Sequence, residues 1–193
     1  MTMVGKKRLD NFKFCIESVL SNSVPGVIVE CGVWRGGSSI FAKGVLTANG
    51  ADRNLYLCDS FEGLPKSVLR QDQAINWTRS GDYLGVALET VKDNFSRHHL
   101  LDEKVKFLKG WFKDTLPKFP EDKIAVLRCD GDMYESTMDI LNNLYPKVQT
   151  GGFVIIDDWT IPCCQLAFKD FFGAKMPEII KIDVDSVYFK KTS

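Results

Sequence analysis

The sequence lacks the motifs on which several common enzyme classes depend. It contains no G-x-S-x-G turn and no H-E-x-x-H pair, so serine hydrolase and zinc protease chemistry have no support. The spacing G-x-G-x-x-G and a Tyr-x-x-x-Lys proton relay are also absent, which argues against a nicotinamide-dependent oxidoreductase. The two histidines, His98 and His99, fall at the polar end of an expected helix, where positive charge suits the helix dipole.

Long apolar runs and an excess of one charge are missing too. Lys plus Arg and Asp plus Glu number 25 each, so nothing indicates a basic surface for nucleic acid or for an anionic membrane. The longest apolar runs have the length of strands, and residues 1–7 do not open a hydrophobic stretch, which argues against a transmembrane helix and a signal peptide. The 6 cysteines include no C-x-x-C pair, and we expect reduced thiols in a cytoplasmic protein.

Apolar residues alternate between helical and strand-like spacing along the chain. Helical spacing occurs in residues 9–20, 38–47, 84–100, 111–116, 134–145 and 164–172. Short apolar segments predict strands at residues 27–29, 55–58, 105–108, 124–129, 153–156, 179–182 and 186–189. Strands separated by helices in this way form parallel sheets with right-handed crossovers and helices on both faces.

The last two expected strands are too close together for a helix between them. We therefore expect a hairpin, which places an antiparallel strand in an otherwise parallel sheet. The prediction is an α/β, Rossmann-like fold with a seven-stranded, mostly parallel sheet, a C-terminal antiparallel strand and helices on both faces, as in class I methyltransferases. The 193 residues suffice for one such domain, with residues 1–25 as an N-terminal helical segment and residues 60–84 as a lid or substrate loop.

The turn after the first strand is the first candidate binding element, because ligands of open parallel sheets bind beyond the carboxyl ends of the strands. Gly32 and Gly36 would allow close approach of a ligand, and the next helix offers free N–H groups to an anion. Glu30 favours a cationic group, such as the amino group of a methionine moiety, and Asp59 is placed to bind a ribose diol. A structural tight turn, and a capping role for Asp59, are the alternatives. Arg128, unusual in a central strand, is expected to pair with a carboxylate such as Glu30.

Two expected neighbouring strands end in carboxylates. Asp130 follows one of them, and Asp157 and Asp158 follow the other. Like charges packed together repel one another unless a cation lies among them, and carboxylate oxygens suit Mg²⁺. The alternative is that these residues cap the helices that follow. Asp132 is expected to belong to a turn or to cap the next helix.

Six stretches in this order, spread over nearly the whole chain, resemble the macrocin O-methyltransferase (TylF/MycF) family, which methylates sugar hydroxyls of glycosylated natural products. They are K-R-L-D-N at 7–11, E-C-G-V-W-R-G-G at 30–37, D-S-F-E-G-L-P at 59–65, G-W-F-K-D-T-L-P at 110–117, D-G-D-M-Y-E-S-T at 130–137 and G-G-F-V-I-I-D-D at 151–158.

The resemblance implies S-adenosylmethionine and Mg²⁺ or another divalent cation as cofactors, a small-molecule hydroxyl acceptor and a homodimer. It implies a cofactor site made of Glu30, Gly32, Val33, Trp34, Gly36, Ser38, Asp59, Ser60, Gly110, Trp111, Phe112 and Asp130. Asp130, Asp157 and Asp158 match the metal carboxylates, an arrangement similar to that of catechol O-methyltransferase. Met133 stands where the catechol enzyme has a lysine, so Asp130 is the candidate proton acceptor.

The resemblance also concerns the walls of the substrate pocket. Family members usually carry an upstream segment that contributes to this pocket, so we expect either a shorter relative or a truncated form. In the expected lid, Arg70, Trp77, Arg79 and Tyr83 would grip a polar, ring-shaped acceptor, with ordinary loop disorder as the alternative. The other functions weighed are a nicotinamide-dependent sugar oxidoreductase and a non-catalytic nucleotide- or metal-binding module.

Overall fold

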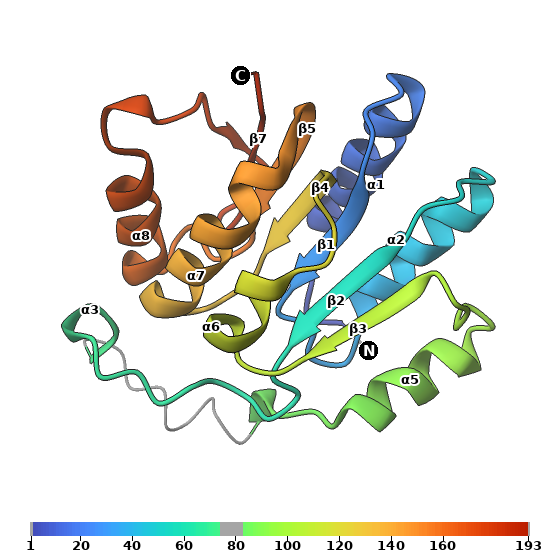
Figure 1. Cartoon of the computed structure of the whole chain (residues 1–193), viewed down its shortest axis with the longest axis horizontal. Helices are drawn as coiled ribbons and strands as arrows, with labels where there is room; N and C mark the ends of the chain where they lie inside the picture. The colour runs from blue at the N-terminus through green and yellow to red at the C-terminus, as the bar shows by residue number, and fades with distance from the viewer. Residues whose placement is uncertain (1, 74–82, 193) are drawn as a thin grey trace.

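The fold is built on a mixed sheet that runs through the centre of the molecule (Figure 1). The computed structural model describes residues 2–73 and 83–192. The strands within them are β1 Val27–Cys31, β2 Leu55–Asp59, β3 Val105–Lys109, β4 Ile124–Cys129, β5 Val148–Ile156, β6 Ile180–Lys181 and β7 Val187–Lys190. Over these described residues they form one seven-stranded sheet with the order β3-β2-β1-β4-β5-β7-β6. The predicted α/β fold is confirmed.

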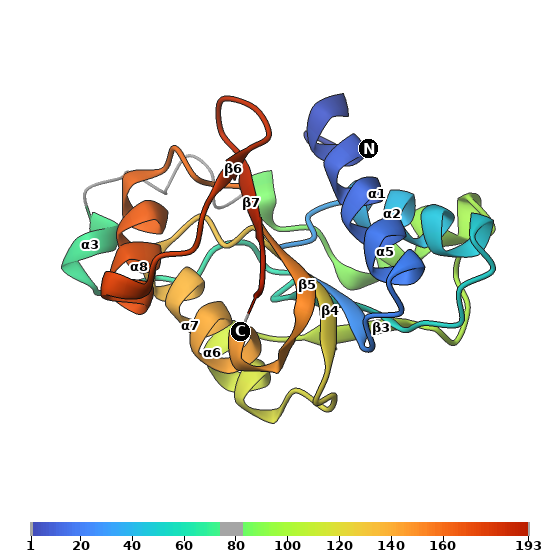
Figure 2. The ribbon, with the colours of Figure 1, turned by 90° about the horizontal axis from the view of Figure 1, so that it is seen from above.

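Helices cover both faces of this sheet, as the view from above shows (Figure 2). One face carries α1 Lys6–Ser21, α2 Gly37–Ala48 and α5 Leu88–Arg97. The other carries α6 Phe112–Thr115, α7 Tyr134–Leu144 and α8 Pro162–Phe172. Single 3₁₀ turns follow three of these helices: Leu116–Lys118, Tyr145–Lys147 and Gly173–Lys175. The short helix α3, Arg70–Gln73, lies beyond the edge of the sheet near α7.

Strand register brings the ends of the central strands level with one another. Cys31 at the end of β1 lies beside Cys58 of β2 and Cys129 of β4, and Cys129 lies beside Ile156 of β5. These pairs are parallel, whereas β7 pairs antiparallel with both β5 and β6, which confirms the predicted hairpin. The residues that follow β1, β2, β4 and β5 therefore meet at a single edge of the sheet.

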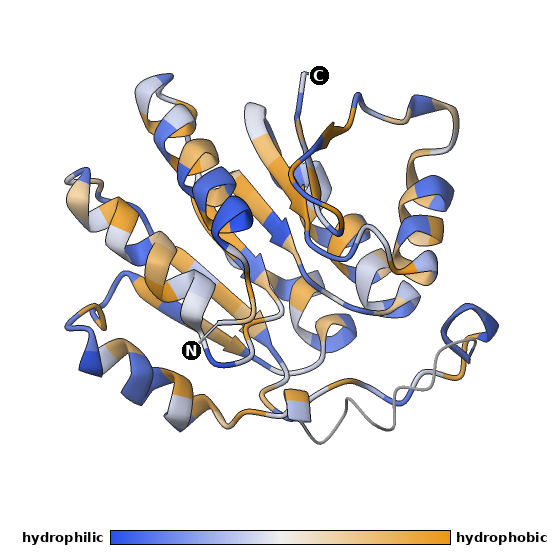
Figure 3. Cartoon of the chain, turned by 180° about the vertical axis from the view of Figure 1, so that it is seen from behind, coloured by the Kyte–Doolittle hydropathy of each residue, from blue (hydrophilic) through white to orange (hydrophobic). Residues whose placement is uncertain are grey.

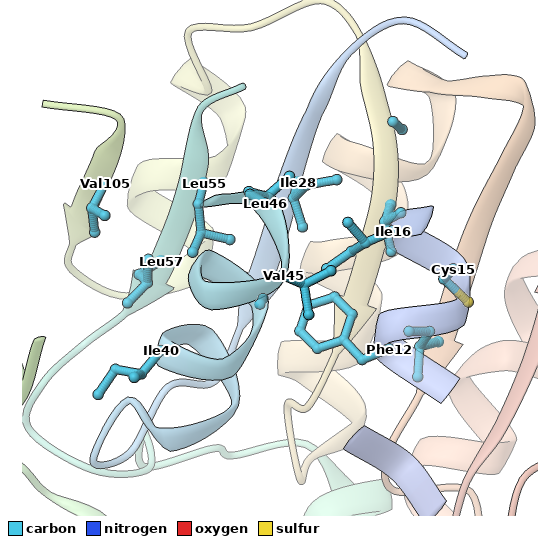
Figure 4. Close-up of a cluster of buried hydrophobic side chains, with 14 of the residues drawn as sticks. Phe12, Cys15, Ile16, Ile28, Ile40, Val45, Leu46, Leu55, Leu57 and Val105 are labelled. Carbon is cyan, nitrogen blue, oxygen red and sulfur yellow. The ribbon is translucent and has the colours of Figure 1, made fainter. Parts of the chain in front are cut away.

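The core fills the space between the sheet and each helical layer. Figure 4 shows one layer, where Phe12 and Ile16 of α1 and Leu46 of α2 pack near Ile28 and Leu55 of the sheet. Each such side chain stabilises the fold by about 1.5–3 kcal/mol when it is fully buried. The strands are largely hydrophobic, and hydrophilic residues gather on the helices (Figure 3). Among the described residues, no helix is long and apolar enough to span a membrane.

The structure differs from the predicted elements mainly at their boundaries. Helix α5 begins at Leu88 rather than at residue 84, because Gly85 crosses closely over the backbone of Glu62. The predicted helix 111–116 is a single α-turn followed by a 3₁₀ turn that contains Pro117. Strand β5 begins five residues earlier than predicted, because two glycines in its first half hide its apolar pattern.

Candidate active site

A cavity of about 660 Å³ opens at the edge where the central strands end. Most of the residues predicted for the cofactor and metal sites line it: Gly32, Val33, Trp34, Ser38, Asp59, Ser60, Trp111, Phe112, Asp130, Asp157 and Asp158. Three predicted cofactor residues, Glu30, Gly36 and Gly110, are not among the residues that line the cavity. The adjacent histidines lie far from the cavity walls at the exposed end of α5, as predicted.

The glycines of the first turn are required by close packing. Gly32 has φ +88°, and a Cβ there would overlap the carbonyl oxygen of Asp130. Gly36 has φ +81°, and a Cβ there would lie 2.8 Å from the Val91 side chain. Both positions thus favour glycine for conformational and steric reasons. The alternative of a structural tight turn therefore applies to both glycines. The turn nevertheless forms one wall of the cavity.

Asp59 joins the turns that follow β1 and β2. Its Oδ2 accepts a hydrogen bond from the N–H of Val33 at 2.6 Å, and its Oδ1 accepts one from the N–H of Phe61 at 2.7 Å. Burial raises the pKa of Asp59, and these N–H groups oppose the rise. The predicted capping role is therefore present. Two longer hydrogen bonds, both 3.4 Å, reach Asp59 from the Trp34 N–H and from Ser60 Oγ. The carboxylate has about four acceptor sites, so a hydroxyl donor in the cavity would have to replace one of these longer contacts.

Glu30 lies beneath the first turn and is fully buried. Its Oε1 accepts hydrogen bonds from Ser38 Oγ at 2.6 Å and from Arg128 Nη1 at 2.7 Å, and Ser39 donates to its Oε2. The predicted pairing of Arg128 with Glu30 is confirmed. Burial raises the pKa of Glu30, whereas Arg128 and the two serine hydroxyls oppose the rise. Glu30 thus fixes Ser38 and the start of α2 from below.

An acidic group lies at the ends of β4 and β5. One carboxylate oxygen from each of Asp130, Asp132 and Asp158 lies within 4.8 Å of the other two. Burial, reinforced by mutual repulsion, raises the pKa of Asp158 to about 6 and raises the pKa values of Asp130 and Asp132 well above their usual range. Three oxygen donors this close to one another fit a hard divalent cation.

Asp157 is held between two guanidinium groups. Its Oδ2 accepts a hydrogen bond from Arg8 Nη1 at 2.9 Å. Its Oδ1 lies 2.7 Å from Arg128 Nη2, close enough for charge attraction but without hydrogen-bond alignment. The group of three close carboxylates thus contains Asp132, which the sequence suggested as a turn or cap residue, and does not contain Asp157, which was predicted as a metal ligand. The D-G-D spacing was the signal for Asp132.

The capping alternative for the acidic group is wrong. The N-cap residues are Met133 for α7 and Ile161 for α8, and within the described chain neither helix start receives a side-chain cap from its own N-cap residue. The first N–H groups of α7, those of Tyr134 and Glu135, instead donate to the carboxylate of Asp72 at 2.6 and 3.2 Å. Asp72 lies in α3 and is buried, and sequence analysis gave no signal for it.

The remaining cavity walls come from outside the sheet. Residues 2–4 before α1, residues 62–66 after β2, and part of α7 contribute side chains. Trp34 contacts Tyr83, with its Nε1 donating to the Tyr83 carbonyl at 3.2 Å. Two residues predicted for the lid, Trp77 and Arg79, lie outside the described residues.

The macrocin O-methyltransferase (TylF) family profile matches residues 1–191. The chain belongs to this family. It is accordingly an O-methyltransferase, which implies S-adenosylmethionine as methyl donor. This assignment replaces the oxidoreductase and non-catalytic alternatives.

Relatives within the TylF family are similar over the whole chain. A tetracenomycin-C rhamnosyl 4'-O-methyltransferase of Streptomyces olivaceus is 49% identical over 199 aligned positions, which cover 100% of this chain and 76% of the relative. Mycinamicin III 3''-O-methyltransferase of Micromonospora griseorubida is 45% identical over 201 positions, covering 100% of this chain and 79% of the relative.

Solved structures agree with this assignment. The O-methyltransferase NovP matches with a TM-score of 0.96 and 47% identity, covering 100% of this chain and 82% of NovP. The calicheamicin methyltransferase CalS11 matches with a TM-score of 0.81 at 21% identity, covering 95% of this chain and 78% of CalS11, and this shows the fold alone.

Proposed function

We propose that this TylF-family enzyme transfers the methyl group of S-adenosylmethionine to a sugar hydroxyl of a glycosylated secondary metabolite, assisted by a divalent cation. This proposal rests mainly on one observation: the acidic group and the first turn line the same cavity. The relatives named above are methyltransferases of rhamnosyl tetracenomycin and of mycinamicin, which supports a sugar acceptor.

The cofactor side of the cavity would be the part lined by the first turn, Asp59 and α6. Val33 and Trp34 form the turn, and Trp111 and Phe112 supply aromatic surface opposite to it. Asp59 would accept a hydrogen bond from the ribose in place of one of its two longer contacts, those with the Trp34 N–H and Ser60 Oγ. Glu30 would act indirectly, by holding Ser38 in the cavity wall.

Asp130 and Asp158 would hold the cation together with Asp157, as the family resemblance implies, and Asp132 lies close enough to take part. A bound divalent cation makes a coordinated hydroxyl more acidic. Asp130 would accept the hydroxyl proton, and burial together with the neighbouring carboxylates raises its pKa, which makes it a stronger base. The cofactor, when bound, would supply the methyl group: the methyl carbon would pass from its sulfur to the hydroxyl oxygen, leaving S-adenosylhomocysteine.

The acceptor side would be formed by the described parts of the predicted lid 60–84, namely residues 60–73 and 83–84; residues 74–82 lie outside the described residues. Residues 62–66 line the cavity, and Asp72 ties the segment to α7. Limited trypsin digestion at Lys66 and Arg70 tests this. Acceptor plus cofactor should slow cleavage more than cofactor alone, and equal rates would contradict an acceptor-binding role.

A methyl-transfer assay with S-adenosylmethionine, Mg²⁺ and a glycosylated acceptor tests the activity, and calorimetry compares S-adenosylmethionine with NADH. D130N should abolish turnover while leaving cofactor affinity within about twofold. D52N is the matched control, because Asp52 is 83% exposed and pairs with a surface lysine. Full activity of the wild type in EDTA would refute the role of the cation.

Two further proposals concern the cellular compartment and the oligomeric state. The cysteines are free and buried, which supports action in the reducing cytoplasm. We also propose the homodimer that the family resemblance implies, which sedimentation analysis would test.

A further inference from the structure

Arg8, near the start of α1, contacts three carboxylates from distant parts of the chain. Its Nη1 donates to Asp157 at 2.9 Å, its Nε to Asp183 at 2.7 Å and its Nη2 to Asp185 at 2.8 Å. The Arg8 side chain is 17% exposed and also lines the cavity. One guanidinium therefore joins α1, the residues after β5 and the turn between β6 and β7.

The β6–β7 turn is itself fixed to the residues that follow Asp158. The N–H of Trp159 donates to the Asp185 carbonyl at 2.8 Å, and Thr160 Oγ1 donates to the Asp185 carboxylate at 2.9 Å. Asp183 accepts hydrogen bonds from the N–H groups of Asp185 and Ser186. These hydrogen bonds fix the turn, so Asp183 and Asp185 are held in position to accept hydrogen bonds from Arg8.

Asp157 has its orientation set by charges on two sides. Arg8 holds its Oδ2, and Arg128 lies against its Oδ1. Arg128 also donates to Asp130, so the carboxylates at the ends of β4 and β5 share one ionic network. Groups that orient metal carboxylates affect metal affinity about 10- to 100-fold when they are removed.

We propose that Arg8 is a positioning residue that holds Asp157 in place for binding of the divalent cation. This inference rests on the proposed function, because it assumes that Asp157 binds the cation together with Asp130 and Asp158. It adds a role for the first helix, which lies outside the sheet, in assembling the metal site.

A purely electrostatic role makes the opposite prediction. Arg8 carries positive charge next to the acidic group, so removing it makes the site more negative and should tighten cation binding. Weaker binding by a folded variant indicates that the orientation of Asp157 matters more than this charge. The direction of the change therefore separates positioning from charge compensation.

The experiment measures Mn²⁺ affinity by electron paramagnetic resonance, without acceptor or turnover, for full-length wild type, R8Q, R8K, D157N and the double variant R8Q/D157N. R8Q should bind Mn²⁺ about tenfold more weakly. R8K should recover only part of this loss, because an ammonium group lacks the fork that contacts three carboxylates. Adding R8Q to D157N should change the affinity less than twofold, since the two residues act as a unit.

Matched controls separate positioning from general destabilisation. K6Q removes an exposed ion pair between Lys6 and Asp10, each two residues from Arg8, and should leave Mn²⁺ affinity unchanged. D185N removes a half-exposed partner of Arg8 but leaves its contact with Asp157, and should change the affinity less than twofold. Circular dichroism at the assay temperature verifies that each variant is folded. If R8Q is unfolded, R8K, alone and combined with D157N, carries the test.

If the wild type fails to bind Mn²⁺, the role of the cation in the proposed function is refuted, and this inference is refuted with it. Mn²⁺ binding by wild type with unchanged or tighter binding by R8Q would refute the inference alone. Equal losses from R8Q in the wild-type and D157N backgrounds would also overturn it, because Arg8 would then act independently of Asp157.

Discussion

Replacing Arg128 with methionine tests the ionic network beneath the cavity. Arg128 is 1% exposed and contacts Glu30, Asp130 and Asp157 within 2.7 Å. In R128M, Asp157 keeps its contact with Arg8, whereas Glu30 keeps only its two serine donors. Glu30 is fully buried, so its charge would remain largely uncompensated in the interior.

The magnitude follows from the cost of an unpaired buried charge. Removing one partner of a buried ion pair destabilises a protein by about 3–5 kcal/mol. For a chain of this size, 1 kcal/mol corresponds to about 2–4 °C in Tm, so R128M should melt about 6–20 °C below wild type. The double variant E30Q/R128M should be more stable than R128M, because it removes the isolated carboxylate as well.

The loss should also depend on pH. Burial raises the pKa of Glu30 in the folded protein and Arg128 opposes the rise, so R128M raises this pKa further. An acid with a raised folded pKa contributes stability at low pH that is lost as the pH rises through that pKa. R128M should therefore lose more stability at pH 8 than at pH 5.

Urea denaturation followed by tryptophan fluorescence measures these free energies at both pH values. A loss under 1 kcal/mol for R128M at pH 8 would refute the argument. So would a double variant less stable than R128M, because relief of the isolated Glu30 charge would then be negligible.

Further changes test other contacts. D72A should lower the free energy of unfolding by about 0.5–2 kcal/mol through loss of the α7 cap, measured by urea denaturation, and should raise KM for the acceptor more than Kd for the cofactor. G32A should cost several kcal/mol, because its Cβ would meet the Asp130 backbone, whereas G50A, also at positive φ but with open space, should cost about 1–2 kcal/mol in the same assay. D139N should stabilise the protein by about 1 kcal/mol at pH 7.5, a value reduced for solvent screening, because burial raises the pKa of Asp139 to about 6. That gain should shrink as the pH falls from 6 to 4 in thermal melts, and an equal gain at every pH would contradict it.

The fold was predictable because its signals are local. Apolar strands separated by helical periods define a parallel sheet, and the short spacing before β7 requires a hairpin. Some boundary errors have local causes, such as the glycines in β5, whereas the start of α5 was missed because a tertiary contact decides it. Gly85 leaves the helical pattern because it crosses the backbone of Glu62, which no local spacing reveals.

The candidate site was predictable where residues directly follow strands, as Asp59 and Asp130 do. Strand ends meet at one edge, so sequence position alone places these side chains near the cavity. The contacts of Arg8 and Asp72 gave no comparable signal, because each acts across a long stretch of sequence: Arg8 on Asp157, and Asp72 on the start of α7. Arg8 belongs to the K-R-L-D-N stretch of the family resemblance, but that stretch does not reveal its partner. Such contacts depend on the packing of whole elements.

The division of the cavity walls has a consequence for enzyme engineering. The charged floor of the cavity consists of strand ends whose carboxylates Glu30 and Asp130 form ion pairs with Arg128. Residues 2–4 and 62–66 form walls that are not part of the sheet. Chimeras that exchange these wall segments with those of a TylF relative would leave the ion pairs of the floor in place. New acceptors can therefore be sought by segment exchange, with the chemistry inherited unchanged.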